Sequence, residues 1–404
     1  MKLSWIVAAA AVLGVGLIDS FAPAADWAQF RGPQGTSAAA NASLPTTWGE
    51  KENVAWKVPV PGRGPSSPIV VGDRVIVTAS DGVIQERMHV AAYDVKTGKQ
   101  AWHRQFWATG RTYSHPDSAN AAPTPASDGK RIYAFYSSND LVCLDLDGNL
   151  LWFRGLAHDY PKAGNDVGMS SSPVVIGETV VVQVENFGDS FAAGLDASTG
   201  ETRWRHPRKQ VSNWCSPTAF KQADGKELVL LQSPGLLTAH DPMSGQQVWQ
   251  FEAACKTIPS TVAVGGRVYV PANGMVALDL TEGTAPKVAW ESPQLNPGSA
   301  SPILVGDRIY TMNGGGVLTC GDVASGKNLW QLRVGGTYWA TPVVAGNLMY
   351  CINQDGKTKI VKLDDKKGEI VGEADFGEKI QGSPAIAGNA LFVRSDKHLW
   401  KIAK

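Results

Sequence analysis

One unit of roughly 40 to 55 residues recurs along the 404-residue chain, and this repeat constrains the fold more than any other feature. The unit begins with Ser-Pro or Thr-Pro, continues as two apolar runs around a glycine turn, and closes on Leu-Asp-x-x-Ser/Thr-Gly-x-x-x-Trp. Eight prolines mark the starts: Pro68, Pro123, Pro173, Pro217, Pro259, Pro302, Pro342 and Pro384. The aspartates of the second turn are Asp94, Asp145, Asp196, Asp241, Asp279, Asp322 and Asp364. A fixed period of this length predicts neighbouring copies of one supersecondary unit.

Each unit contains four short stretches in which apolar and polar residues alternate, which is the period-2 pattern of β-strands. In one unit these stretches are 301–304, 308–312, 317–320 and 328–332. Four strands per unit make one propeller blade, so the sequence predicts an all-β, eight-bladed β-propeller with four-stranded blades. The segment Asp145-Leu146-Asp147-Gly148 is similar to the start of a calcium loop, but no series of ligands follows it, so we expect only a turn there.

The ring is expected to be closed by an N-terminal strand. The eighth unit ends at Lys404 after three strands, whereas residues 53–58, which contain Trp56, read as a fourth strand that precedes the first Ser-Pro. We therefore predict that this strand completes blade eight and that the propeller spans residues 53–404. The closing tryptophans are expected to be structural core residues: Trp56, Trp102, Trp152, Trp204, Trp249, Trp290 and Trp330. Blade seven has Gly372 at this position, and we expect the weakest joint there.

The N-terminus predicts export. Lys2 is followed by an apolar run over residues 3–17 and by Ala22-Pro23-Ala24, so residues 1–24 read as a secretory signal peptide and residues 25–52 as an extension. A membrane anchor is the alternative, but about 15 apolar residues are fewer than the roughly 20 that a spanning helix needs. We expect a periplasmic or extracellular protein without a transmembrane segment.

The charge balance and the cysteine content limit the classes of binding partner and the disulfide bonds that the chain can form. Basic and acidic side chains number 37 each, so no net field draws the chain to nucleic acid. The five cysteines include no CxxC and are odd in number, so at least one thiol is unpaired within the chain. Cys143, Cys320 and Cys351 lie in strand patterns and are expected to be buried. Cys215 and Cys255 lie in loop-like surroundings, and their spacing leaves open whether they pair.

The repeated unit resembles that of the PQQ-like (pyrroloquinoline quinone-like) β-propeller family, and the resemblance covers residues 53–404. That family includes quinoprotein alcohol dehydrogenases and the propeller lipoprotein of outer-membrane β-barrel assembly, so the resemblance implies the fold and leaves enzyme and scaffold both open. The segments Asp26-Trp27-Ala28-Gln29-Phe30-Arg31-Gly32-Pro33 and Pro61-Gly62-Arg63-Gly64 resemble the start of secreted bacterial propellers of this family that lack an assigned activity.

The candidate site is the upper mouth of the central channel, where the second-to-third strand turns and the crossings between blades would lie. The crossings are long, for example residues 103–121 and 153–170, whereas the lower turns are tight glycine turns. Binding residues concentrate on long loops held by a rigid scaffold. The candidate ligand- or partner-binding residues are Arg63, Arg111, Tyr113, His115, Asp117, Glu185, Asn186, Trp214, Tyr338 and Trp339.

The preferred function is a non-catalytic binding or assembly scaffold, monomeric, with a protein or a cell-surface glycan as partner and with no catalytic residue, cofactor or metal. The alternative is a quinone-dependent alcohol or sugar dehydrogenase, and a glycan-processing enzyme is more distant. For the dehydrogenase, the resemblance implies a disulfide of two adjacent cysteines and a calcium ion held by Glu, Asn and Asp. No Cys-Cys dipeptide occurs, and only Glu185-Asn186 offers a fragment of the calcium set.

Overall fold

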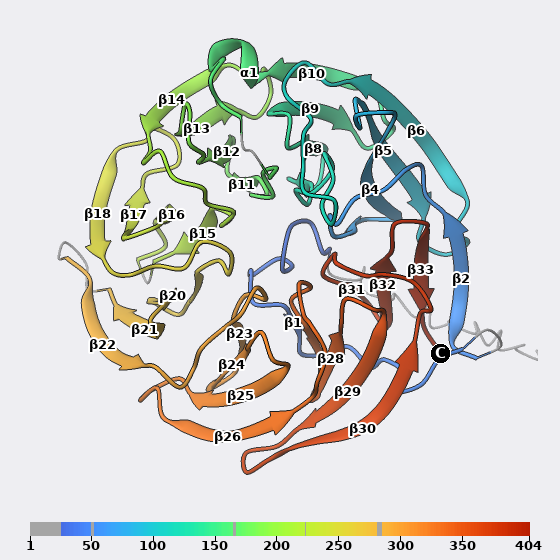
Figure 1. Cartoon of the computed structure of the whole chain (residues 1–404), viewed down its shortest axis with the longest axis vertical. Coiled ribbons are helices and arrows are strands. Elements are labelled where there is room, and N and C mark those ends of the chain that lie inside the picture. The colour runs from blue at the N-terminus through green and yellow to red at the C-terminus, as the bar shows by residue number, and fades with distance from the viewer. Residues whose placement is uncertain (1–25, 50–51, 165–166, 223, 281–284) are drawn as a thin grey trace, which may run out of the picture.

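The computed structural model describes residues 26–49, 52–164, 167–222, 224–280 and 285–404, and over these residues the protein is a ring of eight four-stranded blades (Figure 1). The expected signal peptide, residues 1–24, lies outside the described residues. Within them the one helix is α1 (Leu156–Asp159), which lies in the crossing between blades two and three. No helix of the described chain is long and apolar enough to cross a membrane. The predicted all-β, eight-bladed propeller is confirmed.

The strands of blades one to seven follow chain order from the central axis to the rim. Blade one comprises β3 (Ile69–Val71), β4 (Arg74–Asp81), β5 (Arg87–Asp94) and β6 (Gln100–Trp107), and blade two comprises β7 (Ala126–Ser127), β8 (Arg131–Phe135), β9 (Asp140–Asp145) and β10 (Leu150–Gly155). Blade three comprises β11 (Val174–Ile176), β12 (Thr179–Val184), β13 (Phe191–Asp196) and β14 (Thr202–Pro207), and blade four comprises β15 (Thr218–Lys221), β16 (Glu227–Ser233), β17 (Leu236–His240) and β18 (Gln247–Glu252). Blades five to seven comprise β19 (Val262–Val264), β20 (Arg267–Ala272), β21 (Gly274–Asp279), β22 (Lys287–Ser292); β23 (Ile303–Val305), β24 (Arg308–Met312), β25 (Val317–Asp322), β26 (Asn328–Arg333); and β27 (Val343–Ala345), β28 (Leu348–Ile352), β29 (Lys357–Leu363), β30 (Gly368–Asp375).

Blade eight contains both ends of the propeller. Its inner strands are β31 (Ala385–Ala387), β32 (Ala390–Arg394) and β33 (His398–Ile402), and its outer strand is β2 (Val54–Pro59). β2 pairs antiparallel with β33, so that Trp56 lies opposite Lys401. The predicted closure by the N-terminal strand is therefore confirmed, and it removes the open edge that two chain ends would leave in the ring.

The closing tryptophans join neighbouring blades. The Trp102 indole of blade one lies on Gly148 of blade two, where an added Cβ would be 2.6 Å from the ring, and its Nε1 donates to the Leu146 carbonyl at 2.8 Å. Gly148 has φ +81°, which a residue with a side chain rarely adopts. Such an indole buries about 150 to 250 Å², worth at most about 4 to 6 kcal/mol. The same pairing recurs at Trp56 and Gly98, Trp152 and Gly200, Trp204 and Gly245, Trp290 and Gly326, and Trp330 and Gly368.

Blade seven takes its tryptophan from outside the repeat. In β30, Gly372 occupies the ladder position that Trp330 occupies in β26. Trp48 of the N-terminal extension is buried there and stacks on Tyr350 with 6.4 Å between ring centroids, much as Trp330 packs with Tyr310 at 5.9 Å. The expectation of a weak joint rested on an empty position, and Trp48 fills that position.

The segment that carries Trp48 can pack here only because residue 372 is a glycine. A Cβ on Gly372 would stand 2.2 Å from the Thr46 carbonyl oxygen. We predict that G372A displaces the segment that carries Trp48 and lowers the free energy of unfolding by about 1 to 3 kcal/mol, the usual cost of overpacking. Chemical denaturation of the two proteins measures the difference. The matched control is G314A, since no atom lies within 4 Å of a Cβ built on Gly314. Equal stability of G372A and the parent protein would contradict the prediction.

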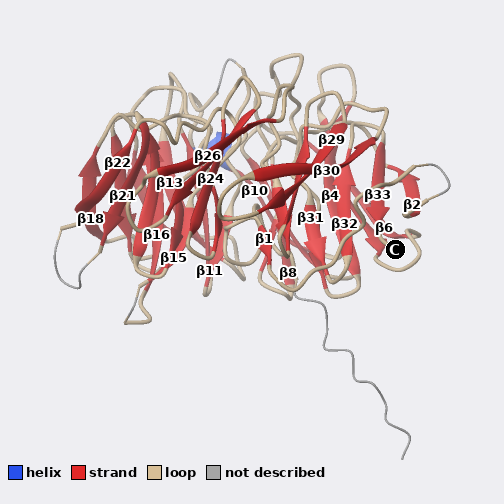
Figure 2. Ribbon diagram, turned by 90° about the horizontal axis from the view of Figure 1, so that it is seen from below, coloured by secondary structure: helices blue, strands red, loops and turns tan. Residues whose placement is uncertain are grey.

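The N-terminal extension crosses the central channel (Figure 1). It does so at the lower end, where Asp26 Oδ1 accepts from the N–H of Gly72 in a lower turn at 2.9 Å. The backbone of Trp27 bridges to Val70 of blade one, Arg31 reaches blades four and five, and β1 (Ala38–Ala39) pairs parallel with β27 of blade seven. Trp27 is 2% exposed, so the segment is anchored like a core element. The channel is thereby obstructed from below, while the larger loops rise from the upper edge of the ring (Figure 2).

All five cysteines lie among the described residues, and all are buried free thiols. Cys143, Cys320 and Cys351 lie in strands as predicted, in the packed interior of the blades. Cys215 and Cys255 do not form a disulfide in this structure. Burial raises the pKa of the Cys255 thiol to about 11, so it is protonated and unreactive at neutral pH.

Candidate functional site

A ring of eight hydroxyl groups surrounds the central channel, one from the start of each blade. In seven places the backbone N–H of one ring residue donates to the hydroxyl of the next, at 2.9 to 3.0 Å, for example from Ser260 to Ser301. The ring therefore both links the blades and lines the channel. Its members are Ser67, Thr124, Ser172, Ser216, Ser260, Ser301, Thr341 and Ser383. These are the Ser-Pro and Thr-Pro positions of the repeat, with Thr124 before Pro125 in blade two and Ser260 after Pro259 in blade five.

Above the ring lies a cavity of about 420 Å³, which we call the cup, lined by all eight ring residues. Phe30 of the N-terminal extension also lines the cup, and because this extension crosses the channel from below, Phe30 forms its floor. Ile258, Val167 and Trp214 supply apolar wall. The volume is within the range of small-molecule sites, about 300 to 1,000 Å³.

Two of the predicted aromatic residues stand at the mouth of the cup together with His115. The Trp214 Nε1 donates to the Gly168 carbonyl at 2.8 Å, which fixes its ring. Trp339 is 44% exposed, and its Nε1 donates to the Gln354 side chain at 3.0 Å. The structure thus brings three of the predicted residues, Trp214, Trp339 and His115, to one cavity.

Charged groups at the mouth are paired with one another. Asp117 lines the cup and forms an ion pair with Lys379 at 2.5 Å, a hydrogen bond that lowers the pKa of this carboxyl group. Arg63 donates to the Pro116 carbonyl at 2.9 Å and lies 3.7 Å from Asp396. Arg63 therefore holds the loop that carries His115 and Asp117 rather than lining the cup itself.

Six of the ten predicted residues do not line the cup: besides Arg63, and Glu185 and Asn186 below, they are Arg111, Tyr113 and Tyr338. Tyr338 is 3% exposed and packs in the core shared by blades six and seven, because the next residue, Trp339, takes the outward position. Tyr113 is 59% exposed, and the Arg111 guanidinium lies 5.9 Å from its ring centroid. Tyr338 is therefore a core residue and not a binding residue, which corrects the prediction. Arg111 and Tyr113 line none of the cavities described here and lie together on an outer loop.

Glu185 and Asn186 lie at the start of the upper loop that follows β12, but both are buried structural residues and neither lines the cup, which corrects their expected role at the mouth. The Glu185 Oε1 accepts hydrogen bonds from Arg208 Nε at 2.9 Å, from Gln183 Nε2 at 2.8 Å and from the Ser233 hydroxyl. Asn186 turns its own loop by accepting from the Gly188 N–H at 2.6 Å. The Glu185 carboxylate is thus held in an ion pair and the Asn186 amide in a turn, and the described part of the chain contains no cluster of three or more His, Cys, Asp or Glu side chains that could hold a metal ion.

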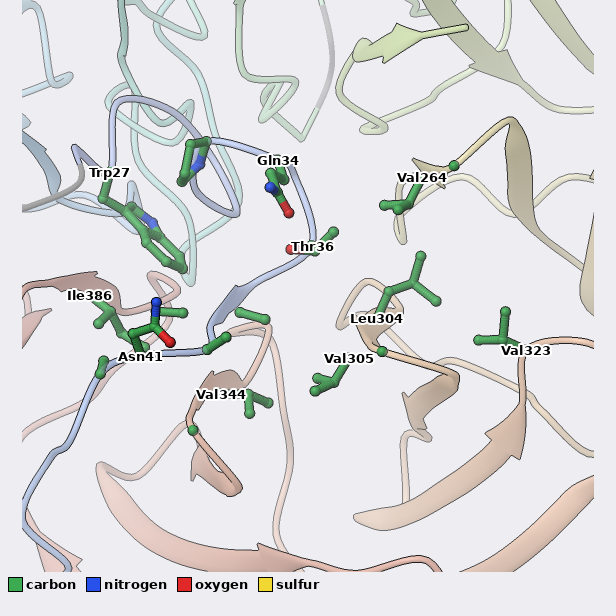
Figure 3. Close-up of a pocket in the computed structure, with 18 of the residues that line it drawn as sticks. Trp27, Gln34, Thr36, Asn41, Val264, Leu304, Val305, Val323, Val344 and Ile386 are labelled. Carbon is green, nitrogen blue, oxygen red and sulfur yellow. The ribbon is translucent and has the colours of Figure 1, made fainter. Parts of the chain in front are cut away.

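A second cavity, of about 1060 Å³, lies on the lower face between the N-terminal extension and the turns of blades five to eight (Figure 3). Gln34 and Thr36 of the extension line it across from Val264 and Leu304. Because the lower turns are short, the sequence analysis placed the candidate site on the upper face and did not predict a cavity on the lower face. It arises because the extension spans the face without filling the space between itself and the blades.

The sequence analysis missed Phe30, Ile258 and the hydroxyl ring. The sequence does contain a signal for the ring, since Ser or Thr recurs at the start of each repeat. The sequence analysis used this residue only to mark where each repeat begins. Phe30 and Arg31 lie in a segment without strand periodicity, so the pattern did not place them.

Comparisons with known proteins agree with the propeller fold. The family model described as outer membrane protein assembly factor BamB matches residues 46–185, 109–296 and 273–371. The outer membrane protein assembly factor BamB of Burkholderia pseudomallei is 24% identical over 82% of each chain. Among solved structures, BamB from Moraxella catarrhalis (TM-score 0.61, 19% identity, 86% of this chain and 98% of that one) and a europium-containing methanol dehydrogenase (TM-score 0.68, 14% identity, 92% and 89%) share the fold. By the extent of the family match, the chain belongs to the family described as outer membrane protein assembly factor BamB.

Proposed function

We propose that this protein is an exported, non-catalytic scaffold that binds a protein partner through its upper face in outer-membrane protein assembly. The family assignment supports the assembly role, and one observation supports the face. Four aromatic side chains stand exposed among the described residues, and all four lie toward the upper face: Trp107 at the upper end of the outer strand β6, and Tyr113, Phe187 and Trp339 on upper loops. Exposed aromatic residues are enriched at protein interfaces, where a few of them supply most of the binding free energy.

The dehydrogenase alternative has less support from the side chains. Glu185 is neutralised by Arg208 at 2.9 Å and is 1% exposed, so it does not face the cup. Reconstitution with the quinone and calcium, followed by a dye-linked alcohol assay, tests this alternative directly. We expect no additive-dependent oxidation, and turnover that requires both additives would favour the enzyme.

Site-specific photocrosslinking in the native host tests the scaffold. A photoreactive residue at Trp107, Phe187 or Trp339 is expected to give adducts with components of outer-membrane protein assembly. The matched controls are Val264 on the lower face and Val288 on the rim, which are 43% and 46% exposed. Adducts at the controls but not at the upper positions, or no adduct at any position, would overturn the proposal.

A further inference from the structure

The hydroxyl ring presents unused donors to the cup. Seven of its eight oxygens already accept a backbone N–H, whereas within the described residues none of the eight hydroxyls donates to a protein acceptor. A Ser or Thr hydroxyl has one proton to donate. Because accepting the N–H polarises the O–H, each hydroxyl becomes a better donor. The ring therefore offers converging donors to whatever occupies the cup.

A buried cation lies beneath the floor. Arg31 is 4% exposed and donates to the Thr261 carbonyl at 2.9 Å, the Ser260 carbonyl at 3.5 Å and the Thr218 hydroxyl at 3.3 Å. Its guanidinium lies 5.3 Å from the centroid of the Phe30 ring. Burial lowers the Arg31 pKa to about 10, so the side chain remains charged at neutral pH.

This charge has no acidic partner on the described chain, since Arg31 forms no ion pair there. The one carboxylate that lines the cup, Asp117, is already bound by Lys379 at the mouth. Interactions of buried charges are screened less by salt than those at the surface. Arg31 does not itself line the cup, but its guanidinium lies behind Phe30, and this uncompensated charge favours negative charge in the lower part of the cup.

The walls select the body of the ligand. Phe30 lies below, and Ile258 and Trp214 lie at the side, so an apolar or aromatic ring would be enclosed between them. Aromatic side chains favour offset or edge contacts with such rings.

We propose that the cup binds a small organic carboxylate with an apolar or aromatic body. The carboxylate oxygens accept from the hydroxyl ring above the buried Arg31, and the ring of the ligand lies against Phe30 and Trp214. This site goes beyond the proposed scaffold function because it uses the interior of the cup and not the exposed rim.

Calorimetry with two matched probes tests the charge requirement. Phenylacetate and its neutral amide, phenylacetamide, have the same body, and we expect the carboxylate to bind at least about tenfold more tightly, a difference of about 1.4 kcal/mol. Glucuronate and glucose form a second pair that lacks the apolar body. Equal binding of both members of the first pair, tighter binding of glucose, or no binding of phenylacetate would overturn the proposal.

Three variants locate the binding. T341V removes one ring hydroxyl and is expected to weaken phenylacetate binding about tenfold. T311V is its matched control, because Thr311 is buried in β24 and its hydroxyl has no partner. I258W fills the cup from the wall and is expected to abolish binding, which keeps the test decisive if T341V does not fold. Phenylacetate binding unchanged in folded I258W would place the ligand elsewhere and overturn the proposal. Upper-face crosslinking of I258W is expected to persist, so failure of this site and failure of the scaffold proposal are distinguishable.

Discussion

A chain that begins at Val60 is expected to lose the cooperative unfolding transition of the chain that begins at Asp26. The shorter chain lacks β2 and therefore leaves β33 as an open edge. It also lacks Trp27, Trp48 and Trp56, which are 2%, 7% and 8% exposed. At about 4 to 6 kcal/mol each as an upper estimate, the three indoles together match the whole stability of a typical domain, about 5 to 15 kcal/mol. Thermal unfolding followed by circular dichroism compares the two chains.

The control restores the missing segment without the covalent link. A synthetic peptide of residues 26–59 added to the shorter chain is expected to return part of the transition, because the peptide can pair with β33 from solution. An unfolding midpoint of the shorter chain equal to that of the longer one would show that the blade does not need its N-terminal strand.

The substitution W48A is expected to lower the free energy of unfolding by about 3 to 5 kcal/mol, the range for truncating a buried large aromatic residue. Trp48 contacts Tyr350 and also Phe376, whose ring centroid lies 5.3 Å away. Alanine leaves both rings facing a cavity that Gly372 cannot fill. Denaturant titration of the purified protein measures the loss.

The matched control for W48A is W107A. Trp107 is 61% exposed on an outer strand, so its removal is expected to change the free energy of unfolding by less than about 0.5 kcal/mol. Similar losses in the two variants would show that Trp48 is not a core residue of blade seven.

The fold was predictable because its information is periodic. The same aspartate, glycine and tryptophan spacing specifies the same turn in blades one, three, four and six. In blade one, for example, the Asp94 Oδ1 accepts from the Thr97 N–H and hydroxyl at 2.7 Å each. Ring closure was predictable for the same reason, since Trp56 belongs to the repeat. Trp48 does not, and its contact with Tyr350 joins residues that no local pattern relates.

The site was predictable only as far as loop length and residue type could take it. Trp214 and Trp339 do meet at the cup, because long crossings converge on the channel. Glu185 was misplaced because its partner Arg208 follows the next outer strand, and pairing in space is not visible in sequence order. Phe30 was missed because a nonrepeating segment gives no register from which to infer its depth in the channel.

The closure of the ring also determines when folding can finish. The Ser43 N–H bonds to the Asn389 side chain 346 residues later, and β2 pairs with the last strand of the chain. β2 must therefore stay unpaired until β33 has been synthesised. Contacts so distant in sequence slow folding, and exposed strand edges in the interim favour aggregation. A prematurely terminated chain would thus be an open arc of blades, with unpaired strand edges that can pair with other chains, and not a smaller closed propeller.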